Sequence, residues 1–207
     1  MRRTKEDAAI TKEQLLKAAL HYFHEKGYLA TTLEDIARAA GTTRGAVYWH
    51  FGSKAELFSA VIREQYNRAG AALARTYTTG GTPLEMLRRV LIGWTSYAEE
   101  DSDFRIMLEL KVLQTGFHPE LEEGIQESFY YTDRVVKQFA DMIKRAIDVG
   151  EVRPDVKPET AAITALGGMI YGITSFWLMN QKLFSLRTLA EEAVDIFIRG
   201  ISVQPER

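Results

Sequence analysis

Cysteine is absent from this 207-residue chain, and histidine and proline are scarce, with four and five residues. The absence of cysteine excludes disulfides, a thiolate nucleophile and a cysteine-ligated metal. The histidines do not form an HExxH motif, and the chain has no GxSxG, Walker or dinucleotide-binding glycine pattern. We therefore expect a protein that is not an enzyme and that binds neither a metal nor a cofactor.

Charge is distributed unevenly along the chain. Residues 1–68 hold 11 Lys and Arg against 8 Asp and Glu, whereas residues 69–207 hold 15 against 20, so the N-terminal third is the positive end. The opening residues M-R-R-T-K-E-D are charged where a secretory signal would need an apolar run. With 46% hydrophobic and 26% charged residues, the composition is that of an ordinary soluble protein, and we expect a cytoplasmic location.

Residues 31–57 have the pattern of two short helices joined by a glycine turn, followed by the start of a third helix. Thr31 and Glu34 fit a capping box at the start of the first helix, and Gly41 fits its end. A longer helix over about residues 11–26 should pack beneath the pair. One face of the first short helix is apolar, formed by Leu33, Ile36, Ala37 and Ala40. The sequence therefore predicts a helix-turn-helix.

The second short helix presents large side chains to solvent. Val47 and Phe51 are four residues apart and should face the core, which turns Tyr48 and Trp49 outward. Folding alone does not favour two exposed aromatic rings, but a helix that enters a DNA groove uses them. After this helix, a second capping pattern begins at Ser53, where a helix N-terminus beside Lys54 favours a phosphate.

The string TRGAVYWHF resembles the recognition helix of the tetracycline-repressor (TetR) family, in which a tyrosine, a variable residue, a histidine and an aromatic close the helix. The match is closest to the multidrug-efflux regulators, which often open with a similar RRTKE run. This resemblance implies an all-α fold with a helix-turn-helix domain at 1–52, a connecting helix at 53–79 and a ligand-binding and dimerisation domain within 53–207. It also implies a homodimeric repressor of a palindromic operator, released by a small hydrophobic or aromatic effector and controlling efflux.

The DNA-contacting residues follow from the same resemblance. It implies contacts from Thr32 at the front of the first short helix and a phosphate held by Lys54. Trp49 is also expected to contact DNA, because its ring should point outward. The residues of the second helix that the family pattern would place on DNA are Thr43, Arg44, Gly45, Tyr48 and His50.

Several alternatives stay open on the sequence alone. Similar helix pairs occur in proteins that never bind DNA. The chain could also be an enzyme whose helical domain carries such a pair at its start, or an architectural protein that binds DNA of any sequence. His50 could instead satisfy a backbone carbonyl. The basic residues Arg2, Arg3 and Lys5 form either an arm that lies along DNA or a solvated tail.

Residues 160–181 contain no charge over 22 positions, which is long enough for a membrane span, and Gly168 and Gly172 form a GxxxG pair. We reject a membrane span, because threonines and glycines dilute its hydrophobicity and no basic cluster flanks it. A helix that is apolar all round is buried by its own domain and by a partner. With a last helix at about 186–201, it predicts a four-helix dimer interface.

The C-terminal domain is rich in large aromatic and Met side chains at helical spacing. Such residues usually form core, but a pocket lined by them suits flat, apolar effectors. Glu109 is expected to pair with Arg105 or, alternatively, to meet a cationic ligand. The acidic run at 99–103 is expected to be a solvated turn rather than a metal site. The predicted ligand-binding residues are Trp94, Tyr97, Phe104, Met107, Phe129, Phe139, Tyr171 and Trp177.

Overall fold

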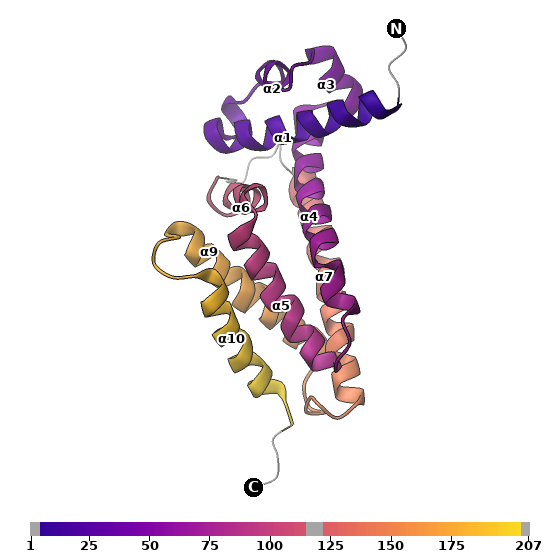
Figure 1. The fold of residues 1–207 in the computed structure, drawn as a ribbon, viewed down its shortest axis with the longest axis vertical. Coiled ribbons are helices and arrows are strands. Elements are labelled where there is room, and N and C mark those ends of the chain that lie inside the picture. The colour runs from indigo at the N-terminus through magenta and orange to yellow at the C-terminus, as the bar shows by residue number, and fades with distance from the viewer. Residues whose placement is uncertain (1–4, 115–121, 204–207) are drawn as a thin grey trace. The chain divides into compact units, whose positions relative to one another are not determined.

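A computed structural model describes residues 5–114 and 122–203, and over these ranges it is a set of helices without a strand (Figure 1). The predicted all-α class is confirmed. Arg2 and Arg3 lie outside the described residues, as does the side chain of Lys5. The helices are α1 (Lys5–Ala30), α2 (Leu33–Ala39), α3 (Arg44–Phe51), α4 (Lys54–Thr78), α5 (Pro83–Glu100), α6 (Ser102–Glu109), α7 (Glu122–Asp148), α8 (Pro158–Ile163), α9 (Tyr171–Met179) and α10 (Leu186–Ile201), with π-helical segments η1 (Leu110–Gln114) and η3 (Thr164–Ile170).

The chain forms two compact units. The first comprises residues within Met1–Arg68 and Ser102–Phe129, so it contains α1 to α3, α4 as far as Arg68, α6, η1 and the start of α7. The second comprises Ala69–Asp101 and Tyr130–Arg207, with α5 and α8 to α10. The sequence-based boundary at residue 52 would place α6 in the C-terminal domain. The division of the folded chain differs from it, because α6 packs against α1.

Aromatic packing holds the first unit together. The rings of Phe23, Tyr28 and Phe58 lie with their centroids 5.4 to 5.5 Å apart, and Phe23 is fully buried. Gly27 breaks the regular turn of α1 with φ 77°, a conformation that side chains other than glycine rarely adopt. The helix expected over 11–26 therefore extends in both directions, and after Gly27 one further turn brings Tyr28 into this cluster.

The capping box of α2 lies one residue later than predicted. Thr32 is the N-cap, its hydroxyl accepts from the Asp35 amide at 3.1 Å, and the Asp35 carboxylate accepts from Thr32. Thr31 is instead buried, and its hydroxyl donates to the carbonyls of Gly27 and Tyr22 at 2.8 and 3.0 Å. Two threonines in succession fit the same sequence pattern, and the carbonyls at the end of α1 decide which of them turns inward.

In the second unit α10 lies alongside α5 (Figure 1). Leu91, Phe139 and Val194 are fully buried in its core. Arg88 Nε donates to Asp195 Oδ1 at 2.6 Å, which raises the pKa of Arg88 and lowers the pKa of Asp195.

Glu99 has a structural role within the acidic run at 99–103. Its carboxylate accepts from the amides of Leu186 and Arg187 at 3.2 and 2.9 Å and from the Ser185 hydroxyl. A carboxylate at this position satisfies the free N–H groups at the start of α10 and complements the helix dipole. The run is therefore more than a solvated turn, since one of its members fixes α10 to the end of α5.

The segments α8, η3 and α9 follow one another directly, and residues Pro158–Met179 are long and apolar enough to cross a membrane by length and composition. Only 28% of their most apolar window is buried inside the described part of the chain. Four large apolar side chains along this segment are more than half exposed, namely Ile163, Tyr171, Phe176 and Met179. Together they form what we call the uncovered apolar face of the segment.

Candidate functional site

Helix α3 is fixed at both ends and along one side. Its N-cap is Thr43, whose hydroxyl accepts from the Ala46 amide at 3.2 Å, and Gly52, with φ 69°, ends it. Val47 is 0% exposed and Phe51 is 5% exposed, so both anchor the helix to the core as predicted. The opposite face of α3 is left for a partner.

That outer face combines a cation with two aromatic rings. Tyr48 is 45% exposed and Trp49 is 73% exposed. Arg44 Nη2 donates to the Tyr48 hydroxyl at 3.0 Å, and the guanidinium lies 5.4 Å from the Tyr48 ring centroid. The hydrogen bond that Arg44 donates to the Tyr48 hydroxyl is the main cause that raises the pKa of Arg44. The guanidinium is thus held in one place, fully charged and open to solvent, which suits bidentate binding of guanine or phosphate.

Gly45 lies beside Arg44 on the same exposed face. A Cβ built there would meet only Thr43 Oγ1, at the ordinary contact distance of 3.8 Å, so nothing within the protein requires glycine. Glycine inside a helix costs about 1 kcal/mol relative to alanine. A surface that must approach the helix backbone closely gives a reason for that cost.

His50 is only half-buried and belongs to the edge of the site. Its ring lies edge-on to Trp49, with centroids 4.5 Å apart, and 5.8 Å from the ring of Phe51. It also lines a pocket of about 250 Å³ together with Lys12, Glu56 and Arg63. Lys12 on α1 and Arg63 on α4 were not foreseen as neighbours of α3, because only the folded unit brings these cations together.

The two predicted contacts outside α3 have different surroundings. Thr32 is exposed at the start of α2, where Asp35 engages its hydroxyl at 2.8 Å. That hydrogen bond is the main reason that the pKa of Asp35 is lowered. Lys54, predicted to hold a phosphate, donates from its ammonium to the carbonyls of Tyr28 and Thr31 at 3.0 and 3.3 Å.

The predicted ligand-binding residues are divided between the two units. Phe104 and Met107 are buried in α6 of the first unit, and Phe129 lies in the early part of α7, whose side chains are outside the described part. In the second unit, Phe139 and Trp177 are buried, Trp94 and Tyr97 are half-buried, and Tyr171 is 52% exposed. Tyr171 belongs to the uncovered apolar face, and none of the eight residues lines either the pocket beside His50 or a second one between α8 and α10.

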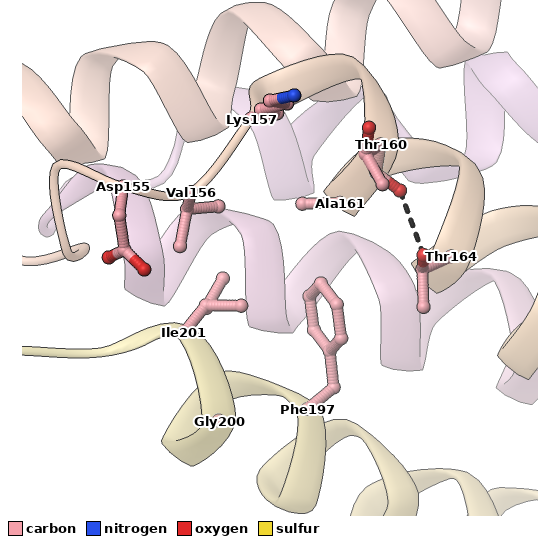
Figure 2. A pocket seen from close by; sticks show the side chains of 9 residues that line it. All are labelled: Asp155, Val156, Lys157, Thr160, Ala161, Thr164, Phe197, Gly200 and Ile201. Carbon is pink, nitrogen blue, oxygen red and sulfur yellow. Dashed lines mark hydrogen bonds between the residues drawn. The ribbon is translucent and has the colours of Figure 1, made fainter.

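A cleft of about 480 Å³ lies between the start of α8 and the end of α10 (Figure 2). Phe197 and Ile201 project into it from α10, facing Ala161 on α8. Thr164 Oγ1 donates to the Thr160 carbonyl at 2.8 Å along its edge. None of the eight predicted ligand-binding residues lines this cleft, whose full lining is Asp155, Val156, Lys157, Thr160, Ala161, Thr164, Phe197, Gly200 and Ile201. Pro154 and Pro158 indicate a turn here, but no sequence signal shows that α10 ends against it.

Two family models match the chain. Residues 15–61 match bacterial regulatory proteins of the tetR family, and residues 82–203 match the C-terminal region of MAATS-type transcriptional repressors. The second match alone covers more than half of the chain.

Full-length relatives agree with these matches. The chain is 30% identical to the HTH-type transcriptional regulator AcrR of Shigella flexneri, covering 95% of this chain and 92% of AcrR. It is also 30% identical to the regulator TtgR of Pseudomonas putida, covering 99% and 98%. Among solved structures, NalD, the secondary repressor of the MexAB-OprM multidrug efflux pump in Pseudomonas aeruginosa, superimposes with a TM-score of 0.81 at 30% identity over 95% of this chain and 97% of NalD.

A second structural relative was solved with a bound compound. The complex of SmeT with triclosan superimposes with a TM-score of 0.82 at 29% identity, covering 95% of this chain and 98% of SmeT. These relatives are transcriptional regulators and not enzymes, which confirms the prediction made from the missing catalytic motifs. The resemblance seen in TRGAVYWHF is confirmed over the whole chain, which belongs to the TetR family and is a transcriptional repressor with a helix-turn-helix DNA-binding domain.

Proposed function

We propose that the chain acts as a homodimer that binds a palindromic operator through α3 and leaves it when a small hydrophobic or aromatic effector binds. The observation that carries this proposal is the exposed face of α3, where Arg44, Tyr48 and Trp49 are available to a partner although the core does not need them there. Two copies of such a helix, related by two-fold symmetry, read two half-sites about 34 Å apart.

Within the operator, Arg44 reads a base while neighbouring groups fix its register. The guanidinium fits guanine O6 and N7, and Gly45 lets the α3 backbone approach the groove. Thr43 and Thr32 lie at the N-termini of α3 and α2, where amide groups favour phosphates. Trp49 and His50 contact sugars and phosphates at the far end of α3. All these positions lie in the first unit, whose residues 1–68 carry the surplus of positive charge.

A second copy of this chain is the proposed partner for the uncovered apolar face. The exposed side chains Tyr171, Phe176 and Met179 would leave water at such a contact, and Gly168 and Gly172 lie on the same exposed part of the segment. The cleft between α8 and α10 has exposed lining residues at Thr164 and Gly200, so it opens on these same helices (Figure 2). A self-complementary contact of this kind accounts for an apolar helix without a membrane, in a cytoplasmic protein.

The effector is proposed to bind among the aromatic and Met side chains predicted from the sequence. SmeT forms a complex with triclosan, and SmeT and NalD are repressors of multidrug efflux pumps. By analogy, planar aromatic compounds are the first effectors to test, and an efflux system is the first candidate for the regulated genes. The effector acts by binding the DNA-free state more tightly than the bound state.

Selection of DNA from a random-sequence pool tests the proposal. The expected result is a palindrome with half-sites one helical turn apart, and sedimentation of the protein alone as a dimer at micromolar concentration. Preference below about threefold for the selected sequence over random DNA would instead indicate an architectural protein, which is expected to bind all sequences alike.

A further inference from the structure

The ammonium of Lys54, at the start of α4, is turned into the first unit. Its Nζ lies 3.0 Å from the carbonyl of Tyr28, 3.4 Å from that of Leu29 and 3.3 Å from that of Thr31. The same atom lies 4.3 Å from the centroid of the Tyr28 ring. An ammonium has three N–H donors, and here three carbonyls face it, so its donors are matched within the protein.

Those carbonyls belong to the corner between α1 and α2. Helix α1 ends at Ala30 and α2 begins at Leu33, so the carbonyls of Tyr28 and Leu29 lie in the last turn of α1, where carbonyl groups point out of the end of a helix. A cation there satisfies them and complements the negative end of the helix dipole. The buried hydroxyl of Thr31 secures the same corner by donating back to Gly27.

We infer that Lys54 is a positioning residue that anchors the α1–α2 corner, and through it the entry into the helix-turn-helix, rather than a ligand of a DNA phosphate. This inference rests on the proposed DNA binding for its functional consequence. Because α2 carries α3, a corner that is no longer held leaves the reading helix less well oriented on every DNA sequence. The charge of Lys54 then contributes to affinity through the fold and not through counterion release.

Lys54→Met tests the inference, because methionine keeps an unbranched apolar stem over Tyr28 but has neither charge nor donors. Without DNA, we expect its Tm to fall by about 2 to 8 °C and amide exchange over residues 31–35 to accelerate. With a duplex selected by the wild-type protein, affinity should fall while the slope of log K against log salt stays within about 0.3 of wild type. A lost phosphate contact would instead reduce that slope by about 0.9.

Lys26→Met is the matched control. Lys26 also lies over a tyrosine ring, 4.8 Å from the centroid of Tyr22, and its side chain is 46% exposed, but its nearest described polar partner is the Asp35 carboxylate at 3.9 Å. The Lys26→Met variant also removes one positive charge from the first unit, and we expect its amide exchange over residues 31–35 to remain as in wild type. Lys54→Arg keeps the charge and donors, and should recover at least half of the lost Tm. It also allows the exchange and salt measurements if the Met variant does not fold.

The two candidate roles of Lys54 give opposite results. An unchanged Tm and exchange rate in Lys54→Met, or a salt slope reduced by about 0.9, overturns the anchoring role. If the wild-type protein selects no DNA, the proposed function fails, whereas the Tm and exchange measurements on the DNA-free protein still decide whether Lys54 anchors the corner.

Discussion

Nε2 of His24 on α1 lies 2.7 Å from Oε2 of Glu109 on α6, although 85 positions separate the two residues in the chain. A second contact joins the same helices, since His21 lies 3.5 Å from Asp103, which also bonds to Arg68 at 3.2 Å. These polar contacts occur inside one compact unit. Helix α6 therefore belongs physically with the DNA-reading helices, and any change in α6 bears directly on α1.

The bond between His24 and Glu109 should contribute measurably to stability. The two side chains are 32% and 16% exposed, so we expect a coupling of about 1 kcal/mol in a double-mutant cycle with His24→Ala and Glu109→Ala, followed by thermal unfolding. The exposed pair Asp133 and Lys137, 60% and 73% exposed, is the control and should give less than about 0.5 kcal/mol. Equal coupling free energies in both pairs would show that the α1–α6 contact stabilises the fold no more than an exposed ion pair does.

Arg44 and Tyr48 should determine sequence preference together. Arg44→Ala is expected to cost about 1 to 3 kcal/mol on the selected operator and to relax the preference at one base per half-site. Tyr48→Phe removes only the hydroxyl that accepts from Arg44, and should lower the ratio of specific to random binding by several fold without changing Tm. Repeating the random-pool selection with each variant measures both effects. An unaltered selected sequence from Arg44→Ala would contradict base reading by this residue.

Asp35 gives α2 a pH-dependent contribution to stability. The hydrogen bond from the Thr32 hydroxyl lowers the pKa of Asp35 below its usual value, so the ionised carboxylate is favoured in the folded state. The resulting stability is present above the unfolded pKa of about 3.9 and is lost as the pH falls through the lower, folded value. Asp35→Asn should therefore lower Tm at pH 7, with a deficit that shrinks below about pH 4.

Glu34→Gln is the control for this pH profile. It removes a charge from the same first turn of α2, where Glu34 is exposed. Its Tm difference from wild type should be small at pH 7, because Glu34 is not part of the Thr32 capping box. A deficit in Asp35→Asn that stays constant from pH 7 to pH 3 would rule out the ionised carboxylate as its source.

Gly172→Lys should separate dimerisation from folding. A Cβ at Gly172 meets nothing within 4 Å, so the protomer has room for the new side chain, whereas a second copy on this face would bury an unpaired charge. We expect an unchanged helix content, sedimentation as a monomer and loss of operator binding. Gly80→Lys, which also has open space but lies in the loop before α5, should remain like wild type. A folded monomer that binds the operator tightly would contradict the need for two reading heads.

The three tryptophans can report on separate events. In variants that retain only Trp94 or only Trp177, an aromatic effector should quench the tryptophan fluorescence, while the operator affinity falls by about 5- to 150-fold. A variant that retains only Trp49, on α3, should respond to operator DNA and not to the effector. Quenching of Trp94 or Trp177 without any change in operator affinity would place the compound in a site that is not coupled to DNA binding.

Local patterns in the sequence were sufficient to predict the reading helix. The spacing of Val47 and Phe51 identified the buried side of α3, and glycines correctly marked the ends of α2 and α3. These predictions succeeded because the periodicity of a short amphipathic helix and the left-handed conformation of Gly41 and Gly52 are local properties.

Contacts between distant segments could not be predicted in this way. The capping pattern fits both Thr31 and Thr32, and only the carbonyls of α1 distinguish them. The direction of Lys54 likewise depends on the corner at Tyr28, 26 residues earlier. Neither periodicity nor composition indicates that α6 packs on α1. The residues that line the effector site remain a prediction, because side-chain packing between helices decides whether an aromatic ring is core or pocket.

The uncovered apolar face of α8, η3 and α9 has a consequence for the concentration of protein that a cell must maintain. If two chains unite there, association is part of folding, and each tenfold dilution shifts the balance towards separate, less stable chains by mass action. A repressor of this kind then responds to its own abundance as well as to its effector. Its operators are released when synthesis slows and the concentration of free chains falls below the dissociation constant of the pair.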